Sequence, residues 1–194
     1  MPRAMAAPYL CAALNALAAV ALATVLAPGV SLAPAASQAS YIADHLAPWR
    51  LGWALWIAAA LSLLAFFFWW ASRIGWSPIA RAAILIAVAG VLADVVAEGR
   101  LIAWSPGRPF DIDGALRLSG IGANGSYSLA GAMLTSRTRG VTPWLAQWSW
   151  TVWALGIGLA VAVAAGSDTW ARLLTAGLFA LLVPWLVVFG RRLA

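Results

Sequence analysis

Five stretches of the chain are apolar over a length that can cross a lipid bilayer. They lie at about 7–27, 51–72, 78–98, 143–165 and 169–190. Roughly 20 helical residues cross a hydrocarbon core about 30 Å thick, and each of these stretches reaches that length. The pattern therefore predicts an all-α, polytopic integral membrane bundle, with the whole chain, 1–194, forming one transmembrane domain.

The first stretch has a second interpretation. It follows Arg3 and precedes the sequence SLAPAASQA, which resembles the cleavage region of a signal peptide. Its apolar run is longer than the hydrophobic part of a usual signal peptide, so we favour a retained helix.

A sixth helix is predicted where hydropathy alone suggests a loop. The stretch 117–140, RLSGIGANGSYSLAGAMLTSRTRG, is rich in Gly and Ser. Small residues recur at every fourth position within it, namely Gly122, Ser126 and Ala130. This spacing lets two helices approach closely in lipid. Asn124, Tyr127 and Ser128 need partners inside a bundle, because unsatisfied polar groups in hydrocarbon are unfavourable. We therefore expect an interior helix over about 114–135.

The positions of the arginines favour six spans over five. With a sixth span and a cytoplasmic N-terminus, the inner side holds Arg3, Arg73, Arg81, Arg137, Arg139, Arg191 and Arg192. The outer side then holds Arg50, Arg100, Arg108, Arg117 and Arg172 together with Asp44, Asp111, Asp113 and Asp168. This arrangement follows the positive-inside rule and places both termini in the cytoplasm. If 114–135 is a loop instead, Arg3 and the Arg191–Arg192 pair lie on opposite sides.

Composition supports a membrane protein and excludes several chemistries. The chain is 64% hydrophobic and 9% charged, with a mean hydropathy of +0.90, whereas soluble domains are about a quarter charged. All 12 basic residues are Arg, so a Schiff base between lysine and retinal or pyridoxal phosphate is impossible. One His and one Cys cannot supply a bis-histidine haem or a Cys/His zinc cage. We expect no cofactor and no metal.

The net charge of +6 does not indicate nucleic acid as a partner, because most of the arginines flank apolar runs. The abundance of Arg, Ala, Gly, Pro and Trp is typical of a high-GC bacterial genome. Together with the apolar spans, it indicates a multi-pass protein of the bacterial inner membrane, with the lipid bilayer as its first partner.

Two carboxylates inside the third span are the strongest functional signal. Asp94 and Glu98 are four residues apart in VLADVVAEGR, so they share one face of a helix. Intramembrane carboxylates are rare and mark transport or binding sites, and two that lie close together favour a shared proton. The alternative is a structural ion pair with Arg117, at similar depth, or with Arg100. Asn124 and Tyr127 are expected to line a polar cavity beside Asp94.

Smaller features are given structural roles. Most of the 13 Trp are expected in interfacial belts, with a stacking platform for a ligand as the alternative. A short interfacial helix is expected over 38–46, and Asp111-Ile-Asp-Gly114 is expected to form a turn and a helix cap. His45 lies in the first outer connection.

These observations lead to two functional hypotheses. The first is binding or transport of a small solute or proton through a polar cavity near the outer face. Its candidate site residues are the carboxylates Asp94 and Glu98, Arg117 as their counter-ion, and Asn124 and Tyr127 as polar lining. The second is a non-catalytic accessory subunit, either in a homo-oligomer or in a larger membrane complex. An enzyme is the third and least favoured reading, because the usual sets of nucleophile, base and metal ligands are missing from the spans.

Overall fold

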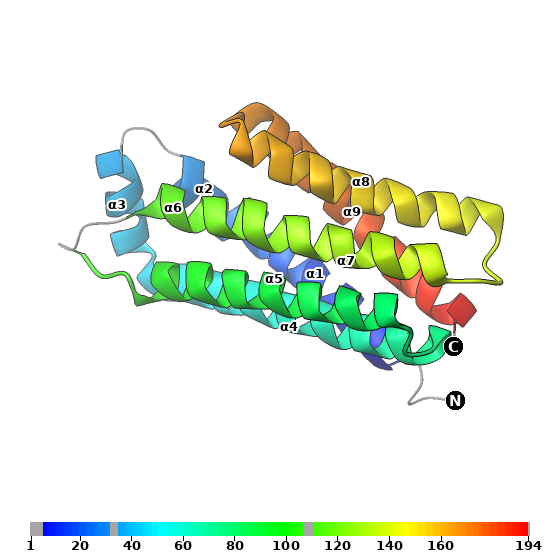
Figure 1. Cartoon of the computed structure of the whole chain (residues 1–194). Coiled ribbons are helices and arrows are strands. Elements are labelled where there is room, and N and C mark those ends of the chain that lie inside the picture. The colour runs from blue at the N-terminus through cyan, green and yellow to red at the C-terminus, as the bar shows by residue number, and fades with distance from the viewer. Residues whose placement is uncertain (1–5, 32–34, 107–110, 194) are drawn as a thin grey trace.

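The computed structural model describes residues 6–31, 35–106 and 111–193, and this part of the chain is helical without any strand (Figure 1). The helices are α1 (Ala6–Ala21), α2 (Ala27–Ser31), α3 (Ala35–Asp44), α4 (Leu46–Ile74), α5 (Pro78–Ala103), α6 (Ile112–Arg117), α7 (Asn124–Arg137), α8 (Pro143–Ala164) and α9 (Asp168–Leu193). Two π-helical turns, η2 (Leu22–Leu26) and η3 (Leu118–Ala123), join α1 to α2 and α6 to α7. The predicted all-α bundle is confirmed.

Five helices are long and apolar enough to cross a membrane. They are Ala6–Val30, Leu46–Ile74, Pro78–Ala103, Pro143–Ala164 and Asp168–Leu193. Each covers one of the five predicted stretches almost entirely, and most continue beyond it. The molecule therefore has the character of a multi-pass membrane protein.

The Gly- and Ser-rich stretch is helical as well. α6, η3 and α7 follow one another without a break over 112–137, and they pack between α5 and α8. Gly122 faces α5, since a Cβ added there would lie 3.4 Å from Ala93 Cβ. On the α8 side, a Cβ added at Gly131 would overlap the Trp153 indole. The alternative of a loop over 114–135 is therefore wrong, and small residues do allow close packing on both sides of this helix.

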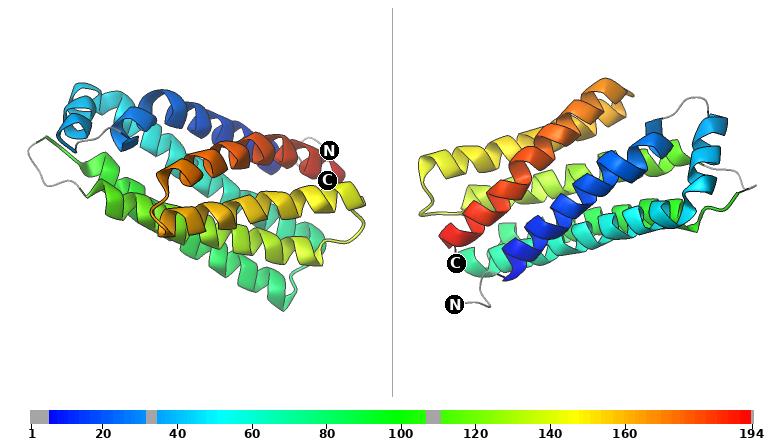
Figure 2. Two further views of the ribbon diagram at one scale, coloured as in Figure 1. Left: turned by 90° about the horizontal axis from the view of Figure 1, so that it is seen from above. Right: turned by 180° about the vertical axis from the view of Figure 1, so that it is seen from behind.

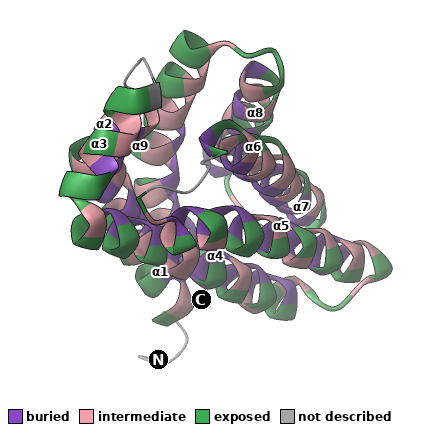
Figure 3. Ribbon diagram, turned by 90° about the vertical axis from the view of Figure 1, so that its left-hand side faces the viewer, coloured by how far each residue is buried: buried purple, intermediate pink, exposed green. Residues whose placement is uncertain are grey.

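The long helices form a closed ring in chain order. α4 packs on α1, α5 on α4, α7 on α5, α8 on α7 and α9 on α8, and α9 returns to α1. α1 begins and α9 ends at the same end of the bundle, which we call the terminal end (Figures 1 and 2). The opposite end carries α3, and we call it the α3 end. Each long helix has buried residues on one side and exposed residues on another (Figure 3).

An aromatic cluster fills the half of the ring near the terminal end. Its members are Phe66, Phe67, Trp70, Trp153, Trp185 and Phe189. The ring centroids of Trp70 and Phe189 are 4.6 Å apart, and those of Trp153 and Trp185 are 5.2 Å apart. Edge-to-face and tilted contacts of this kind add stability beyond the area that they bury. We call these six residues the aromatic plug.

The predicted interfacial role of the tryptophans is therefore wrong for a large part of the set. Six of the 13 are buried in the protein, namely Trp49, Trp53, Trp70, Trp104, Trp153 and Trp185. Only Trp76, Trp144, Trp150 and Trp170 are exposed, as belt residues would be. Counting tryptophans near the ends of apolar runs does not reveal which face of the helix they occupy.

Buried indole N–H groups connect the elements of the ring. Trp49 Nε1 donates to Leu101 O at 3.0 Å and joins α4 to α5. Trp153 Nε1 donates to Thr135 Oγ1 at 2.9 Å and joins α8 to α7. Trp185 Nε1 donates to Ser149 Oγ, and Trp70 Nε1 to Thr138 Oγ1. Each bond satisfies a donor that would otherwise be unpaired inside the bundle.

The α3 end contains the predicted short helix and the predicted cap. α3 overlaps the expected 38–46 helix, and Tyr41 Oη donates to Val25 O at 2.9 Å, in the π turn η2. Asp111 caps α6, because its Oδ1 accepts from Gly114 N at 2.8 Å. His45 is exposed and stacks on Tyr41 with ring centroids 4.3 Å apart.

Close packing of α7 on α8 predicts different effects for two glycines of the same helix. Gly131→Ala should destabilise the protein by about 1–3 kcal/mol, because the new methyl group overlaps the Trp153 indole. Gly125→Ala should be neutral or stabilising by up to about 1 kcal/mol, because its Cβ would meet only Ala160 Cβ, at 3.8 Å, and Ala favours helix. Thermal unfolding in detergent measures both, and equal effects would contradict this packing.

Candidate functional site

Asp94 is a buried carboxylate on α5 whose two oxygens both accept hydrogen bonds from hydroxyl groups. Its side chain is 3% exposed. Ser119 Oγ donates to Oδ1 at 2.6 Å, and Tyr127 Oη donates to Oδ2 at 2.8 Å. Both donors belong to the Gly- and Ser-rich helix, so the predicted proximity of Tyr127 to Asp94 is confirmed.

The π turn η3 brings these two hydroxyls to the same carboxylate. Ser119 and Tyr127 are eight residues apart, and eight residues of a regular helix leave two side chains about 80° apart around the axis. A π turn accommodates one additional residue. Ser119 and Tyr127 therefore have the relative orientation of residues seven apart in a regular helix, which lie on one face. The Tyr127 side chain also leans toward the N-terminus of its helix, as helical side chains do, and reaches back to Asp94.

Gly90 makes room for the Tyr127 ring. A Cβ at this position of α5 would lie 2.8 Å from Tyr127 Cε1. Gly90 precedes Asp94 by one helical turn, so the ring crosses α5 at Gly90 and its hydroxyl reaches the carboxylate. The local sequence of α5, with a glycine one turn before the acid, thus determines how Tyr127 is placed.

A cavity of about 50 Å³ lies beside Asp94 in the interior of the ring. All six long helical stretches line it, through Asn15 (α1), Trp56 (α4), Asp94 (α5), Tyr127 (α7), Trp153 (α8) and Phe179 (α9). A cavity needs about 10–15 Å³ to hold one water molecule, so this one has room for a few waters or a small ion. Its polar groups are on α1, α5 and α7, and Trp153 of the aromatic plug closes it on one side.

The amide side chains of the cavity are held by neighbouring backbone. Asn15 Nδ2 donates to Cys11 O at 2.9 Å. Asn124 lines the cavity as predicted, and its Nδ2 donates to Ser119 O at 3.3 Å, across the π turn. Each amide therefore keeps its carbonyl oxygen for another donor. Among the residues that the structure describes, no arginine lines the cavity.

Glu98 is buried without any hydrogen-bond partner. It is 0% exposed, and neither carboxylate oxygen has a partner among the described residues. The bond from Trp49 to Leu101 sets the level of α4 against α5. One turn further along α4, Trp53 lies at about the depth of Glu98, and its indole N–H is likewise buried and unpartnered. Glu98 does not line the cavity beside Asp94.

The predicted ion pair with Arg117 is wrong. Arg117 is exposed, as is Arg100, and in the described part of the chain no ion pair joins either of them to Asp94 or Glu98. Arg50, at the same end, donates to the backbone oxygens Ile102 O and Trp104 O instead. The prediction used only the depth of Arg117 along its helix, which is similar to that of the acids. In the structure the Arg117 side chain lies on another side of the helix and is exposed.

The structure thus brings together three of the five predicted site residues, Asp94, Asn124 and Tyr127. Glu98 lies one turn away, and Arg117 is excluded. Ser119 was not predicted, because only the π turn brings it into line with Tyr127. Within the described residues, no three His, Cys, Asp or Glu side chains are grouped as a metal site would require.

The chemistry of this site is that of a carboxylate held by two hydroxyl donors at the wall of a small, largely apolar cavity. Among the described residues no basic side chain neutralises it. A buried carboxylate of this kind is favourable for a positive charge beside it. No protein-family profile, no curated protein and no solved structure matches the chain, so this inference rests on the geometry alone.

Proposed function

We propose that the protein binds a proton or a small monovalent cation at Asp94 and transports it across a membrane. The supporting observation is the position of Asp94: it is buried, lies on a cavity that all six long helices line, and has no cationic partner in the described chain. A charged carboxylate in a low-dielectric interior requires compensation, and a mobile positive charge supplies it.

The hydrogen bonds at Asp94 link the binding of a proton or cation to the packing of α5 against η3 and α7. Both hydroxyl groups can donate to the carboxylate only while both of its oxygens act as acceptors. A proton on one oxygen weakens the hydrogen bond that this oxygen accepts from Ser119 or Tyr127, because a neutral carboxyl oxygen is a poorer acceptor than a carboxylate oxygen. Occupancy of Asp94 therefore changes the contact of α5 with η3 and α7, and this contact is the element that we propose to move during transport.

The size of the cavity limits the substrate. A volume of about 50 Å³ excludes sugars, amino acids and larger solutes. The aromatic plug packs between the cavity and the terminal end, and Trp153 belongs to both the plug and the cavity wall. A carrier that exposes the site to one side at a time fits this arrangement better than an open channel does.

We further propose six membrane spans, with both termini in the cytoplasm of a bacterium and the chain in its inner membrane. The helix over 112–137 is long enough to cross the bilayer, and its neighbours in the ring shield its polar side. The terminal end carries Arg73, Arg81, Arg137, Arg139, Arg191 and Arg192. This excess of arginine is what the positive-inside rule requires of a cytoplasmic side.

Cysteine labelling tests the sixth span. In a Cys11→Ala background, which removes the only cysteine of the chain, Arg117→Cys and Arg139→Cys each introduce a single thiol. We expect a membrane-impermeant maleimide to reach these two positions from opposite sides. Labelling of both from the same side of sealed vesicles would rule out the six-span arrangement.

Asp94→Asn should abolish proton or cation flux in proteoliposomes, because it keeps the size of the side chain and removes its charge. Tyr127→Phe should reduce flux by at least roughly tenfold, since a hydrogen bond to a charged group is worth about 1.5–3 kcal/mol. Asp113→Asn, the same chemical change at an exposed position, is the matched control and should leave flux unchanged.

Thermal unfolding of all three variants separates loss of function from loss of folding. If Asp94→Asn is folded and transports as the unchanged protein does, the transport proposal is wrong. Stable co-purification of that variant with other membrane proteins would then favour the alternative role, an accessory subunit of a larger complex.

A further inference from the structure

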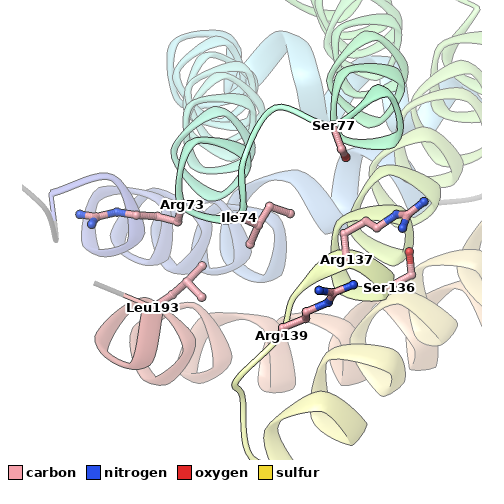
Figure 4. A pocket seen from close by; sticks show the side chains of 7 residues that line it. All are labelled: Arg73, Ile74, Ser77, Ser136, Arg137, Arg139 and Leu193. Atoms are coloured by element: carbon pink, nitrogen blue, oxygen red, sulfur yellow. The ribbon is translucent and has the colours of Figure 1, made fainter.

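A second concave site lies at the terminal end, far from Asp94. It is a cleft of about 410 Å³ between the end of α4, the start of α5 and the end of α7 (Figure 4). Arg137 and Arg139 provide its positive charge on the α7 side, and Ser77 lies at the start of α5. Arg73 also lines the cleft, but its guanidinium extends away from the other two (Figure 4).

The charge at this end is entirely positive among the described side chains. It carries six arginines, namely Arg73, Arg81, Arg137, Arg139, Arg191 and Arg192. The chain contains six acidic residues in total. Two of them, Asp94 and Glu98, are buried within α5, and the other four, Asp44, Asp111, Asp113 and Asp168, lie at the α3 end. No acidic side chain can therefore neutralise the cleft.

Helix stability alone does not account for these arginines. Arg73 and Arg137 lie in the last turns of α4 and α7, where a cation offsets the negative end of the helix dipole. Arg139 lies two residues beyond the end of α7 and is not needed for that purpose. It nevertheless lines the same cleft as Arg137, and both are exposed.

The start of α5 adds groups that suit an anion. Ser77 Oγ accepts from Ala80 N at 3.2 Å, which leaves its hydroxyl proton for an acceptor in the cleft. The positive end of the dipole of this 26-residue helix lies at the same place. Guanidinium groups, a hydroxyl donor and a helix N-terminus together form a typical phosphate site.

The surroundings of the cleft match the depth of lipid headgroups. Ile74 and Leu193 give it an apolar border. Trp76 follows Ile74 closely in the chain and is 44% exposed, and Trp144, just inside the start of α8, is 47% exposed. Exposed tryptophans concentrate at the boundary between lipid and water, so a phosphate of the membrane is within reach of Arg137 and Arg139.

We propose that this cleft binds a phosphate group, carried either by an anionic phospholipid or by a soluble phosphate. The proposal does not depend on transport at Asp94, since the two sites share no lining residue.

Native mass spectrometry of the purified protein tests the lipid source. We expect phosphatidylglycerol to bind more tightly than phosphatidylcholine. Arg137→Gln with Arg139→Gln should weaken phosphatidylglycerol binding roughly thirtyfold. Each of the two arginines near an anionic headgroup contributes about 1 kcal/mol, and every 1.4 kcal/mol is about a factor of ten in binding. The matched control, Arg100→Gln with Arg172→Gln, removes the same charge from exposed positions at the α3 end and should leave binding unchanged.

Thermal unfolding of delipidated protein tests the soluble source. Inorganic phosphate, compared with chloride at equal ionic strength, should then raise the unfolding temperature of the unchanged protein and of the control variant, but not of the Arg137/Arg139 variant. A response to only one of the two probes identifies the source. The proposal is overturned if neither probe binds, or if both double variants lose binding equally.

Discussion

A carboxylate buried in a membrane bundle must be neutralised or hydrogen-bonded, and this requirement organises the centre of the molecule. Asp94 meets it through two hydroxyls that come from a single neighbouring helix. The extra residue of the π turn aligns Ser119 with Tyr127, and Gly90 admits the tyrosine ring. The Gly- and Ser-rich helix is too polar to face lipid, and it supplies the hydroxyl donors that Asp94 needs. Its small residues let it pack close enough to α5 for these hydrogen bonds to form. The polar helix and the buried acid therefore satisfy each other's hydrogen-bonding groups inside the bundle.

The ring is divided into two unlike halves. Toward the terminal end, six aromatic side chains pack against one another, and indole N–H groups bond to neighbouring helices and to the connection after α7. Toward the α3 end lie both buried carboxylates and a second apolar cluster, which includes Trp49 and Trp53. Aromatic packing is rigid because close-packed interiors tolerate little change in shape. Both carboxylates lie outside the aromatic plug, so we expect any rearrangement that opens the site to occur in the half toward the α3 end.

The fold could be predicted from the sequence because length and apolarity determine which segments cross a bilayer. The helix over 112–137 was also predictable, since a four-residue spacing of small residues survives in a polar stretch. The site was only partly predictable. The proximity of Asp94 and Tyr127 could be predicted, because they lie at similar depths in neighbouring helices. The position of Ser119 could not, because it depends on a π turn that leaves no periodic pattern in the sequence. Arg117 was wrongly paired with the acids because depth was known and the side of the helix was not. The six buried tryptophans were assigned to interfacial belts for the same reason: their position along the helix was known, but not the face on which they lie.

Glu98 shows what the absence of an arginine partner means for the transport site that we propose, within the part of the chain that the structure describes. Both of its oxygens are buried and unpartnered, which lowers stability relative to an apolar side chain of similar size. An arginine from a neighbouring helix would satisfy such a group permanently, and four described arginines lie at this end of the bundle, yet none turns inward. A permanent ion pair would hold the acids in one charge state. Two carboxylates without a fixed cation can instead change state as protons or small cations enter and leave, and this is the property that a transport site needs.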